Sequence, residues 1–263
     1  MRKYLYLSLA LTGAMAIGVV SLAGADESVQ VEKVSISPTK LDKKKYKPIT
    51  FSNKITTAAM NPTGAITDQP PSATRTVLWL DKNIKLDTKS VKKCKVSSSG
   101  IEGSTPVAAI AACGKRSVVS VDKKMGTSAE VTVGTNGVAP QTIIPVFVTA
   151  FNGKEKNSLY LHSAPSGAFA GLPASILVGK LKNANKVKIA GGPSSTKPYK
   201  KALDVSIPPL GAGAISRFSV TIKAGKYIQA RCKSKKFKVE ATTEFSNAPT
   251  VSDQDVVKCK KKK

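Results

Sequence analysis

Apolar and polar residues alternate with a period of two in the C-terminal part of the chain, and this pattern constrains the fold more than any other feature. The alternation is clearest at residues 203–207, 218–222 and 237–242. Successive side chains of an extended strand point to opposite faces, so each segment presents one apolar and one polar face. The three segments therefore predict an antiparallel sheet with one buried face and one face exposed to water.

Further strand patterns occur at 29–38, 76–80 and 131–133. Residues 142–162 predict a β-hairpin, because a long apolar run reaches an Asn-Gly pair that is typical of tight connections between strands. Many short strands, separated by turns and accompanied by little helix, are typical of layered antiparallel folds. We therefore expect a mainly β fold, an antiparallel β-sandwich or jelly roll.

A short helix is expected at 105–113. Thr105 is suited to capping the start, Pro106 fits the first turn, and Gly114 follows the alanine-rich body. With only about two turns, this helix would be marginal on its own. A disulfide at Cys113 would attach its C-terminal end to the preceding strand or loop.

The first 25 residues have the parts of a secretory signal peptide. Two basic residues precede a long apolar run, for which we expect a helix, and Ala23 and Ala25 supply the small side chains that a signal peptidase accepts. The mature chain would then begin at Asp26. A permanent membrane anchor is the alternative, because the run approaches the about 18 apolar residues that cross a bilayer. The glycine, serine and threonine residues within the run favour removal.

The processed chain, residues 26–263, is long enough for one sizeable all-β core or for two small ones. A Pro/Gly-rich stretch at 191–213 is a possible boundary, but strands are expected on both sides of it, and one β-sandwich domain is the simpler interpretation. No second stretch is apolar and long enough to cross a membrane. We expect a protein that is secreted or associated with the cell envelope.

The four cysteines are Cys94, Cys113, Cys232 and Cys259. An even number of cysteines in an exported chain points to disulfides rather than to metal ligands or catalytic thiols. Four cysteines allow three pairings. We favour Cys94–Cys113 with Cys232–Cys259, because these pairs close the shortest loops. A zinc site is the alternative, but the chain has no Cys-x-x-Cys sequence and only one histidine.

The chain carries a formal charge of +26, and only five of its 42 basic residues are arginine. Lysine is a hydrated point charge, whereas arginine has the planar fork that reads phosphates and guanines. A lysine-rich surface therefore suits diffuse attraction to an anionic cell-wall polymer or another polyanion. The alternative is that the lysines only keep the exported protein soluble. The candidate polyanion contacts are lysines near the C-terminus: Lys233, Lys235, Lys236, Lys238, Lys260 and Lys261.

The sequence predicts no catalytic, cofactor-binding or metal-binding residue. His162 is the only histidine, and alternation places it with Tyr160 on the face opposite Leu159 and Leu161, so we expect it to be exposed. A Ser-His-Asp triad also needs a positioned nucleophile, and no Gly-x-Ser-x-Gly sequence occurs. The 16 acidic residues are thinly scattered among the basic ones, so no carboxylate pair suggests glycoside hydrolysis.

Short sequences around two of the cysteines resemble uncharacterised secreted proteins of actinobacteria. The sequences are Ala112-Cys113-Gly114-Lys115 through Gly126-Thr127-Ser128-Ala129, and Gln229-Ala230-Arg231-Cys232. The resemblance implies a disulfide-bonded, β-rich extracellular fold, and it carries no known catalytic residue.

Three functions are compatible with these features. The first is a non-catalytic exported module with a structural or binding role at the cell envelope. The second is a polyanion binder that uses its lysines to hold teichoic acid, acidic polysaccharide or extracellular nucleic acid. A hydrolase whose site is assembled from distant residues ranks third.

Overall fold

A computed structural model describes residues 27–60, 66–67, 70–121, 127–133, 142–210 and 213–262. The predicted signal peptide and its cleavage site at Ala23, Ala25 and Asp26 lie outside these residues. The mainly β prediction is confirmed, since antiparallel strands dominate and the described residues contain one α-helix. None of the helices in the described ranges is long and apolar enough to span a membrane.

The principal sheet has twelve antiparallel strands. Their order in space is β1 (Glu27–Ser37), β4 (Thr50–Met60), β13 (Gly213–Ile222), β8 (Thr127–Val133), β9 (Thr142–Asn152), β10 (Ser158–Pro165), β11 (Ser175–Asn183), β12 (Tyr199–Ser206), β6 (Ala73–Asp81), β15 (Lys236–Phe245) and β16 (Val251–Lys258), with β5 (Ile66–Thr67) beside β4. The expected hairpin at 142–162 is the β9–β10 pair. The alternating segments predicted near the C-terminus lie in β12, β13 and β15.

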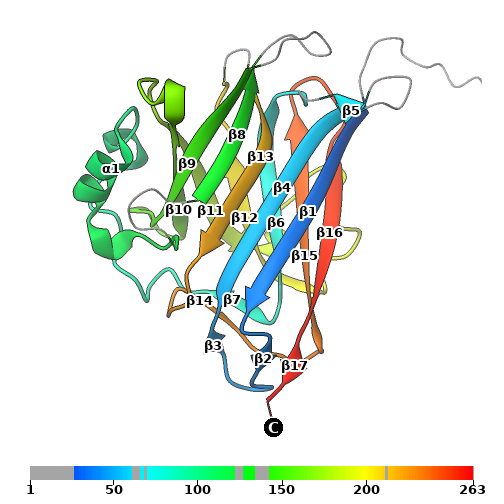
Figure 1. The fold of residues 1–263 in the computed structure, drawn as a ribbon. Helices are drawn as coiled ribbons and strands as arrows, with labels where there is room; N and C mark the ends of the chain where they lie inside the picture. The colour runs from blue at the N-terminus through cyan, green and yellow to red at the C-terminus, as the bar shows by residue number, and fades with distance from the viewer. Residues whose placement is uncertain are drawn as a thin grey trace, which may run out of the picture.

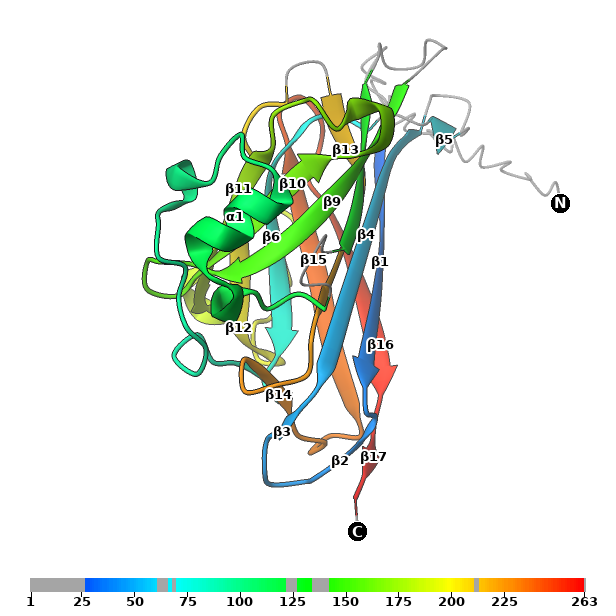
Figure 2. The same ribbon diagram turned by 60° about the vertical axis from the view of Figure 1, so that its left-hand side comes forward.

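The sheet folds over on itself into two layers (Figure 1). Its two ends in the strand order, β1 and β16, consequently lie side by side, as the turned view also shows (Figure 2). Side chains rather than a backbone ladder join them: Asp253 Oδ2 accepts a hydrogen bond from the Glu32 amide at 2.6 Å, and Asp255 Oδ2 accepts one from the Val34 amide at 2.7 Å. We call this junction of β1 and β16 the seam. Asp253 and Asp255 thus accept hydrogen bonds from two backbone N–H groups of β1 that an edge strand would otherwise expose.

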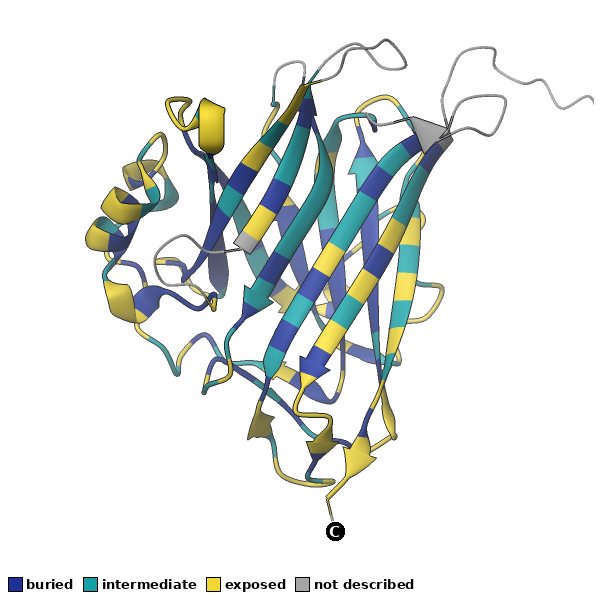
Figure 3. Cartoon of the chain, viewed as in Figure 1, coloured by how far each residue is buried: buried dark blue, intermediate teal, exposed yellow. Residues whose placement is uncertain are grey.

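The main core lies between the two layers. Phe51 and Val220 reach it from one layer, and Leu78, Leu161 and Leu203 reach it from the other. Buried residues alternate with less buried ones along much of β1 and β4, as the period of two requires (Figure 3). Burial of these apolar side chains is the main source of stability for such a fold.

The segment of residues 94–117, which we call the excursion, covers the outer face of the β9–β10 hairpin. It contains α1 (Pro106–Cys113), between the 3₁₀ turns η1 (Ser98–Gly100) and η2 (Lys115–Ser117). Thr105 Oγ1 accepts a hydrogen bond from the Ala108 amide at 3.3 Å, and Gly114 ends the helix with a φ of 87°, which confirms the predicted caps. The Cys94–Cys113 disulfide attaches the end of α1 to the segment that precedes it.

This excursion makes the expected exposure of His162 wrong. Tyr160 and His162 do lie on the face opposite Leu159 and Leu161, but both are 0% exposed. Ile110 and Phe151 belong to the apolar cluster that packs around Tyr160 beneath the excursion. The alternation reports which face a side chain occupies, but it does not report whether another segment covers that face.

Residues 184–199 cover a second part of the outer surface, starting with η4 (Ala184–Lys186). Trp79, Val187 and Tyr199 pack together there, and Trp79 Nε1 donates a hydrogen bond to Thr242 Oγ1 at 3.2 Å. The outer face of β6, β12 and β15 is therefore largely buried, contrary to the expectation of one face exposed to water. Strands before, within and after the Pro/Gly-rich stretch at 191–213, namely β11, β12 and β13, all belong to the principal sheet.

Two small sheets lie at the end of the molecule that carries the C-terminus (Figures 1 and 2). One contains β3 (Lys47–Pro48), β14 (Ile228–Ala230) and β7 (Ile84–Leu86), and the other pairs β2 (Lys40–Leu41) with β17 (Lys260–Lys261) in parallel. The remaining 3₁₀ turn, η3 (Gly167–Phe169), follows β10. The Cys232–Cys259 disulfide joins the segment before β15 to the segment after β16, so both predicted pairings are confirmed.

Candidate anion-binding surface

The C-terminal segment is held against the N-terminal part of the chain by backbone hydrogen bonds. The Lys260 amide donates to the Thr39 carbonyl at 2.9 Å, and the Lys262 amide donates to the Leu41 carbonyl at 2.8 Å. The Cys232 amide also donates to the Asp42 carbonyl at 2.8 Å. Three segments that are distant in the sequence therefore meet at one end of the molecule, around the Cys232–Cys259 disulfide.

Exposed lysines from all three segments gather at this end, which we call the lysine end. They are Lys40, Lys43, Lys44, Lys45, Lys47, Lys233, Lys235, Lys236, Lys258, Lys260, Lys261 and Lys262. Five of the six lysines predicted from the sequence belong to this set. Lys238 is half-buried and lies two residues farther along β15.

Like charges stand directly opposite each other at the lysine end. Lys260 pairs with Lys40 across the two-stranded sheet, and Lys236 pairs with Lys258 where β15 meets β16. Like charges in directly opposed positions destabilise a sheet. The ion pairs of the described residues lie elsewhere, at Lys85–Asp87, Lys182–Asp204, Arg75–Asp204, Arg75–Glu244 and Arg217–Glu130. The repulsion at the lysine end is therefore not relieved by ion pairs within the described part of the chain.

Asp42 is a carboxylate within this region, and its main partners are backbone amides. Its Oδ1 accepts hydrogen bonds from the Lys44 amide at 2.7 Å and the Lys45 amide at 2.8 Å. These two bonds lower the pKa of Asp42, and the charges of Lys47 and Lys45 contribute less. Asp42 therefore shapes the turn that presents the exposed lysines, and one negative charge offsets only a small part of the positive charge.

The arginine beside this region is held by structural contacts. The Arg231 guanidinium lies 4.8 Å from the ring centroid of Tyr46, which is within cation–π distance. Tyr46 in turn donates its hydroxyl to the Lys82 carbonyl at 3.2 Å. Lysine ammonium groups on flexible stems are thus the groups that this end offers to an anion, and they suit a phosphate or carboxylate polymer without fixed geometry.

A second basic site was not singled out from the sequence. Lys115, Arg116, Lys223 and Lys226 line a cavity of about 240 Å³ together with apolar residues that include Tyr227. The cavity lies between the turn after α1 and the turn after β13. No sequence signal marks it, because the two turns are more than a hundred residues apart and meet only in the folded chain.

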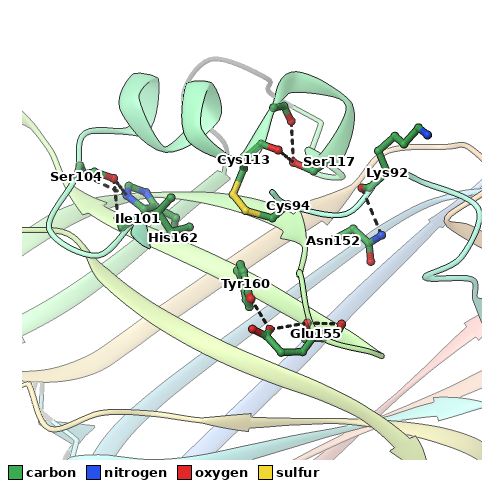
Figure 4. Close-up of a disulfide and its surroundings, with 12 residues drawn as sticks. Lys92, Cys94, Ile101, Ser104, Cys113, Ser117, Asn152, Glu155, Tyr160 and His162 are labelled. Carbon is green, nitrogen blue, oxygen red and sulfur yellow. Dashed lines mark hydrogen bonds between the residues drawn. A yellow bond between two sulfur atoms is a disulfide. The ribbon is translucent and has the colours of Figure 1, made fainter. Parts of the chain in front are cut away.

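His162 is not arranged as a catalytic base in the described structure (Figure 4). Its Nε2 lies 3.0 Å from the Ser104 carbonyl oxygen and 3.3 Å from Ser104 Oγ, while Ser104 Oγ donates to the Ile101 carbonyl at 2.6 Å. Nδ1 has no hydrogen-bond partner among the described residues, so no carboxylate orients the ring. Burial lowers the pKa of His162, which keeps the imidazole neutral near pH 7.

A carboxylate near this site, Glu155, has a different partner. Its side chain accepts a hydrogen bond from the Tyr160 hydroxyl (Figure 4). Burial and this bond raise the pKa of Tyr160 to about 12. The Tyr160–Glu155 contact therefore stabilises the fold beneath the excursion and leaves Glu155 away from His162.

No family model, curated protein or solved structure matches this chain. The resemblance to secreted actinobacterial proteins stays a prediction.

Proposed function

We propose that this protein is an exported, non-catalytic binding module of the cell envelope, and that its lysine end binds an anionic polymer. The observation that carries the proposal is the direct opposition of Lys40 to Lys260 and of Lys236 to Lys258, without compensating ion pairs among the described residues. A polyanion would relieve this repulsion by placing phosphate or carboxylate groups between the ammonium groups. The relief of this repulsion would then make the free energy of binding more favourable.

Export is part of the proposal. The two disulfides are compatible with an oxidising compartment, where such bonds persist. The signal-like first 25 residues favour the same location. Outside the cell, the available polyanions are teichoic acids, acidic polysaccharides and released nucleic acid. The predominance of lysine over arginine favours binding by charge density rather than by base sequence.

The experiment that tests this function is a binding series on the purified protein with teichoic acid, polygalacturonate, duplex DNA and neutral dextran. We expect binding to the anionic polymers, with a logarithm of affinity that falls linearly as the logarithm of salt concentration rises. Dextran should not bind. Preference among the three polyanions at equal salt would identify the class of partner.

A pair of charge-matched variants separates a local site from net charge. One variant replaces Lys40, Lys236, Lys258 and Lys260 with glutamine. The control variant also carries four glutamines, in place of the exposed residues Lys154, Lys156, Lys186 and Lys200. We expect the first variant to bind about tenfold more weakly or worse, with a shallower salt slope, while the control stays close to the unmodified protein. Equal losses in the two variants would mean that the lysines act only through net charge and that the lysine end is no site.

A further inference from the structure

Two adjoining cavities lie between the layers of the sheet. The inner one has a volume of about 80 Å³ and the outer one about 330 Å³. They share the side chains of Leu177, Ile215 and Phe218, so they meet at these three residues, and we call the two cavities together the apolar space. Pro209 and Leu210, which lie between β12 and β13, line the outer cavity. The end of the sheet where β13 begins lies opposite the lysine end (Figure 1).

The lining of this space is mainly apolar, and its polar residues are Asn53, Thr57, Thr76 and Thr243 at the inner cavity and Ser163 and Ser175 at the outer one. No charged residue is among the described residues that line either cavity. Most of the polar groups in the inner lining have partners: Thr57 Oγ1 donates to the Ile215 carbonyl at 2.6 Å, and the hydroxyls of Thr76 and Thr243 lie 3.1 Å apart. A mainly apolar lining of this kind favours apolar molecules over charged ones.

Asn53 is the exception at the inner end. Its side chain lines the inner cavity and is only 3% exposed, and its Oδ1 has no hydrogen-bond partner among the described residues. A buried acceptor without a partner costs stability, so such an atom calls for an explanation. A single water is a poor solution in this lining, because an ordered buried water normally makes about three hydrogen bonds.

The outer end of the space reaches the surface through apolar residues. Leu172 is 49% exposed, and Pro173 and Pro209 beside it are exposed as well. A ligand that enters here would meet no basic group in the lining, although the chain as a whole is strongly basic. The lining therefore disfavours a carboxylate or phosphate ligand, whose charge would be buried without a partner.

We propose that this space binds the aliphatic chain of a neutral long-chain alcohol, whose hydroxyl donates a hydrogen bond to Asn53 Oδ1. The volume of the outer cavity falls within the range of small-molecule sites, and one convergent polar group in an apolar lining is typical of them. The hydroxyl lies at the inner end, and the chain extends past Leu177, Ile215 and Phe218 toward Leu172. This inference does not depend on the role of the lysine end.

The first test compares three probes of equal chain length by calorimetry on the purified protein: a straight-chain primary alcohol, its methyl ether and the corresponding carboxylate. We expect one alcohol to bind per protein molecule, with an affinity that rises about fourfold for each added methylene until the space is full. The methyl ether lacks the donor and should bind about tenfold more weakly. The carboxylate should bind weakest at pH 8. Equal binding of alcohol and ether, or no saturable binding of any probe, would overturn the proposal.

Three variants localise the binding. Asn53→Leu should remove the difference between alcohol and ether, whereas Ile215→Trp should fill the space and abolish binding of both. Leu177→Phe, a smaller change, should shorten the longest chain that binds, and it keeps the test available if Ile215→Trp does not fold. Val107→Ala, at an exposed position on α1, is the control and should bind as the unmodified protein does. Retention of full discrimination in Asn53→Leu would contradict the assigned hydrogen bond.

Discussion

Glu32 lies at the seam on β1, where it is 4% exposed and neither carboxylate oxygen has a hydrogen-bond partner among the described residues. Burial raises the pKa of Glu32 to about 8. The nearby backbone N–H of Ala241 opposes this rise, although its geometry falls short of a hydrogen bond, and the charges of Asp253, Asp255 and Glu240 add to the rise. Glu32 is therefore protonated at pH 7. A neutral carboxyl avoids a fourth negative charge beside those three carboxylates.

This protonation makes the stability of the protein depend on pH. The folded state keeps the Glu32 proton up to about pH 8, while the unfolded chain releases it above about pH 4.5. The contribution of protonated Glu32 to the free energy of unfolding is thus fully present below pH 4.5, and it is lost as the pH rises toward 8. Glu32→Gln is neutral at every pH, so we expect it to be more stable than the unmodified protein at pH 8, by on the order of 2 kcal/mol.

Urea unfolding at pH 5 and pH 8 measures this effect. The free-energy difference between Glu32→Gln and the unmodified protein should be small at pH 5 and should grow toward pH 8. Glu102→Gln, at an exposed position, is the control and should show no such growth. A constant difference for Glu32→Gln between the two pH values would show that Glu32 ionises normally in the folded state.

At the scale of elements, the two disulfides hold different parts of the surface. Cys94–Cys113 attaches the excursion that contains α1, and Cys232–Cys259 attaches the tail that completes the lysine end. Their sequence separations, 19 and 27 residues, are similar, so removal of either should destabilise the fold by a similar amount, about 3 kcal/mol in the loop-entropy description. Because the expected losses of stability are equal, any difference in polyanion binding between the two disulfide variants would come from the position of the bond that was removed.

We expect replacement of both Cys232 and Cys259 by alanine to weaken polyanion binding, although it changes no charge. The tail lysines would then be held opposite Lys40 by backbone hydrogen bonds alone, so the tail would fray more often and the local charge density would fall. Replacement of Cys94 and Cys113 should leave polyanion binding unchanged. Thermal unfolding and the salt-dependent binding series measure the two effects, and the same affinity in both double variants would count against a site formed by the tail.

The elements themselves could be predicted because their signals are local. Alternation marked β12, β13 and β15, capping residues marked α1, and short loops favoured the two disulfides. The lysine end could be predicted only in part, since Lys260, Lys261 and the other predicted lysines lie near the C-terminus in the sequence, while Lys40 joins them through a parallel pair between β2 and β17. Such a long-range pairing leaves no local signal, and neither does the covering of His162 by the excursion.

The whole molecule depends on contacts between distant parts of the chain. β1 pairs with β4 and meets β16 at the seam, β6 lies between β12 and β15, and β13 lies between β4 and β8. Neither layer is built from one continuous half of the sequence. Each layer therefore needs strands from both halves of the sequence. If the parts before and after residues 191–213 folded as separate units, each unit would have long strand edges without a partner.

We therefore expect the protein to unfold in one cooperative transition. Trp79 is the only tryptophan and reports on the apolar cluster outside β6, whereas far-ultraviolet circular dichroism reports on all strands. The two signals should give the same midpoint and slope in urea, since loss of β6 separates β12 from β15 and opens the sheet. The disulfides should stay oxidised during the measurement, because their reduction would add a step of its own. Two separated transitions would show that the strands on one side of residues 191–213 keep their structure without the other side, and they would divide the chain into two domains.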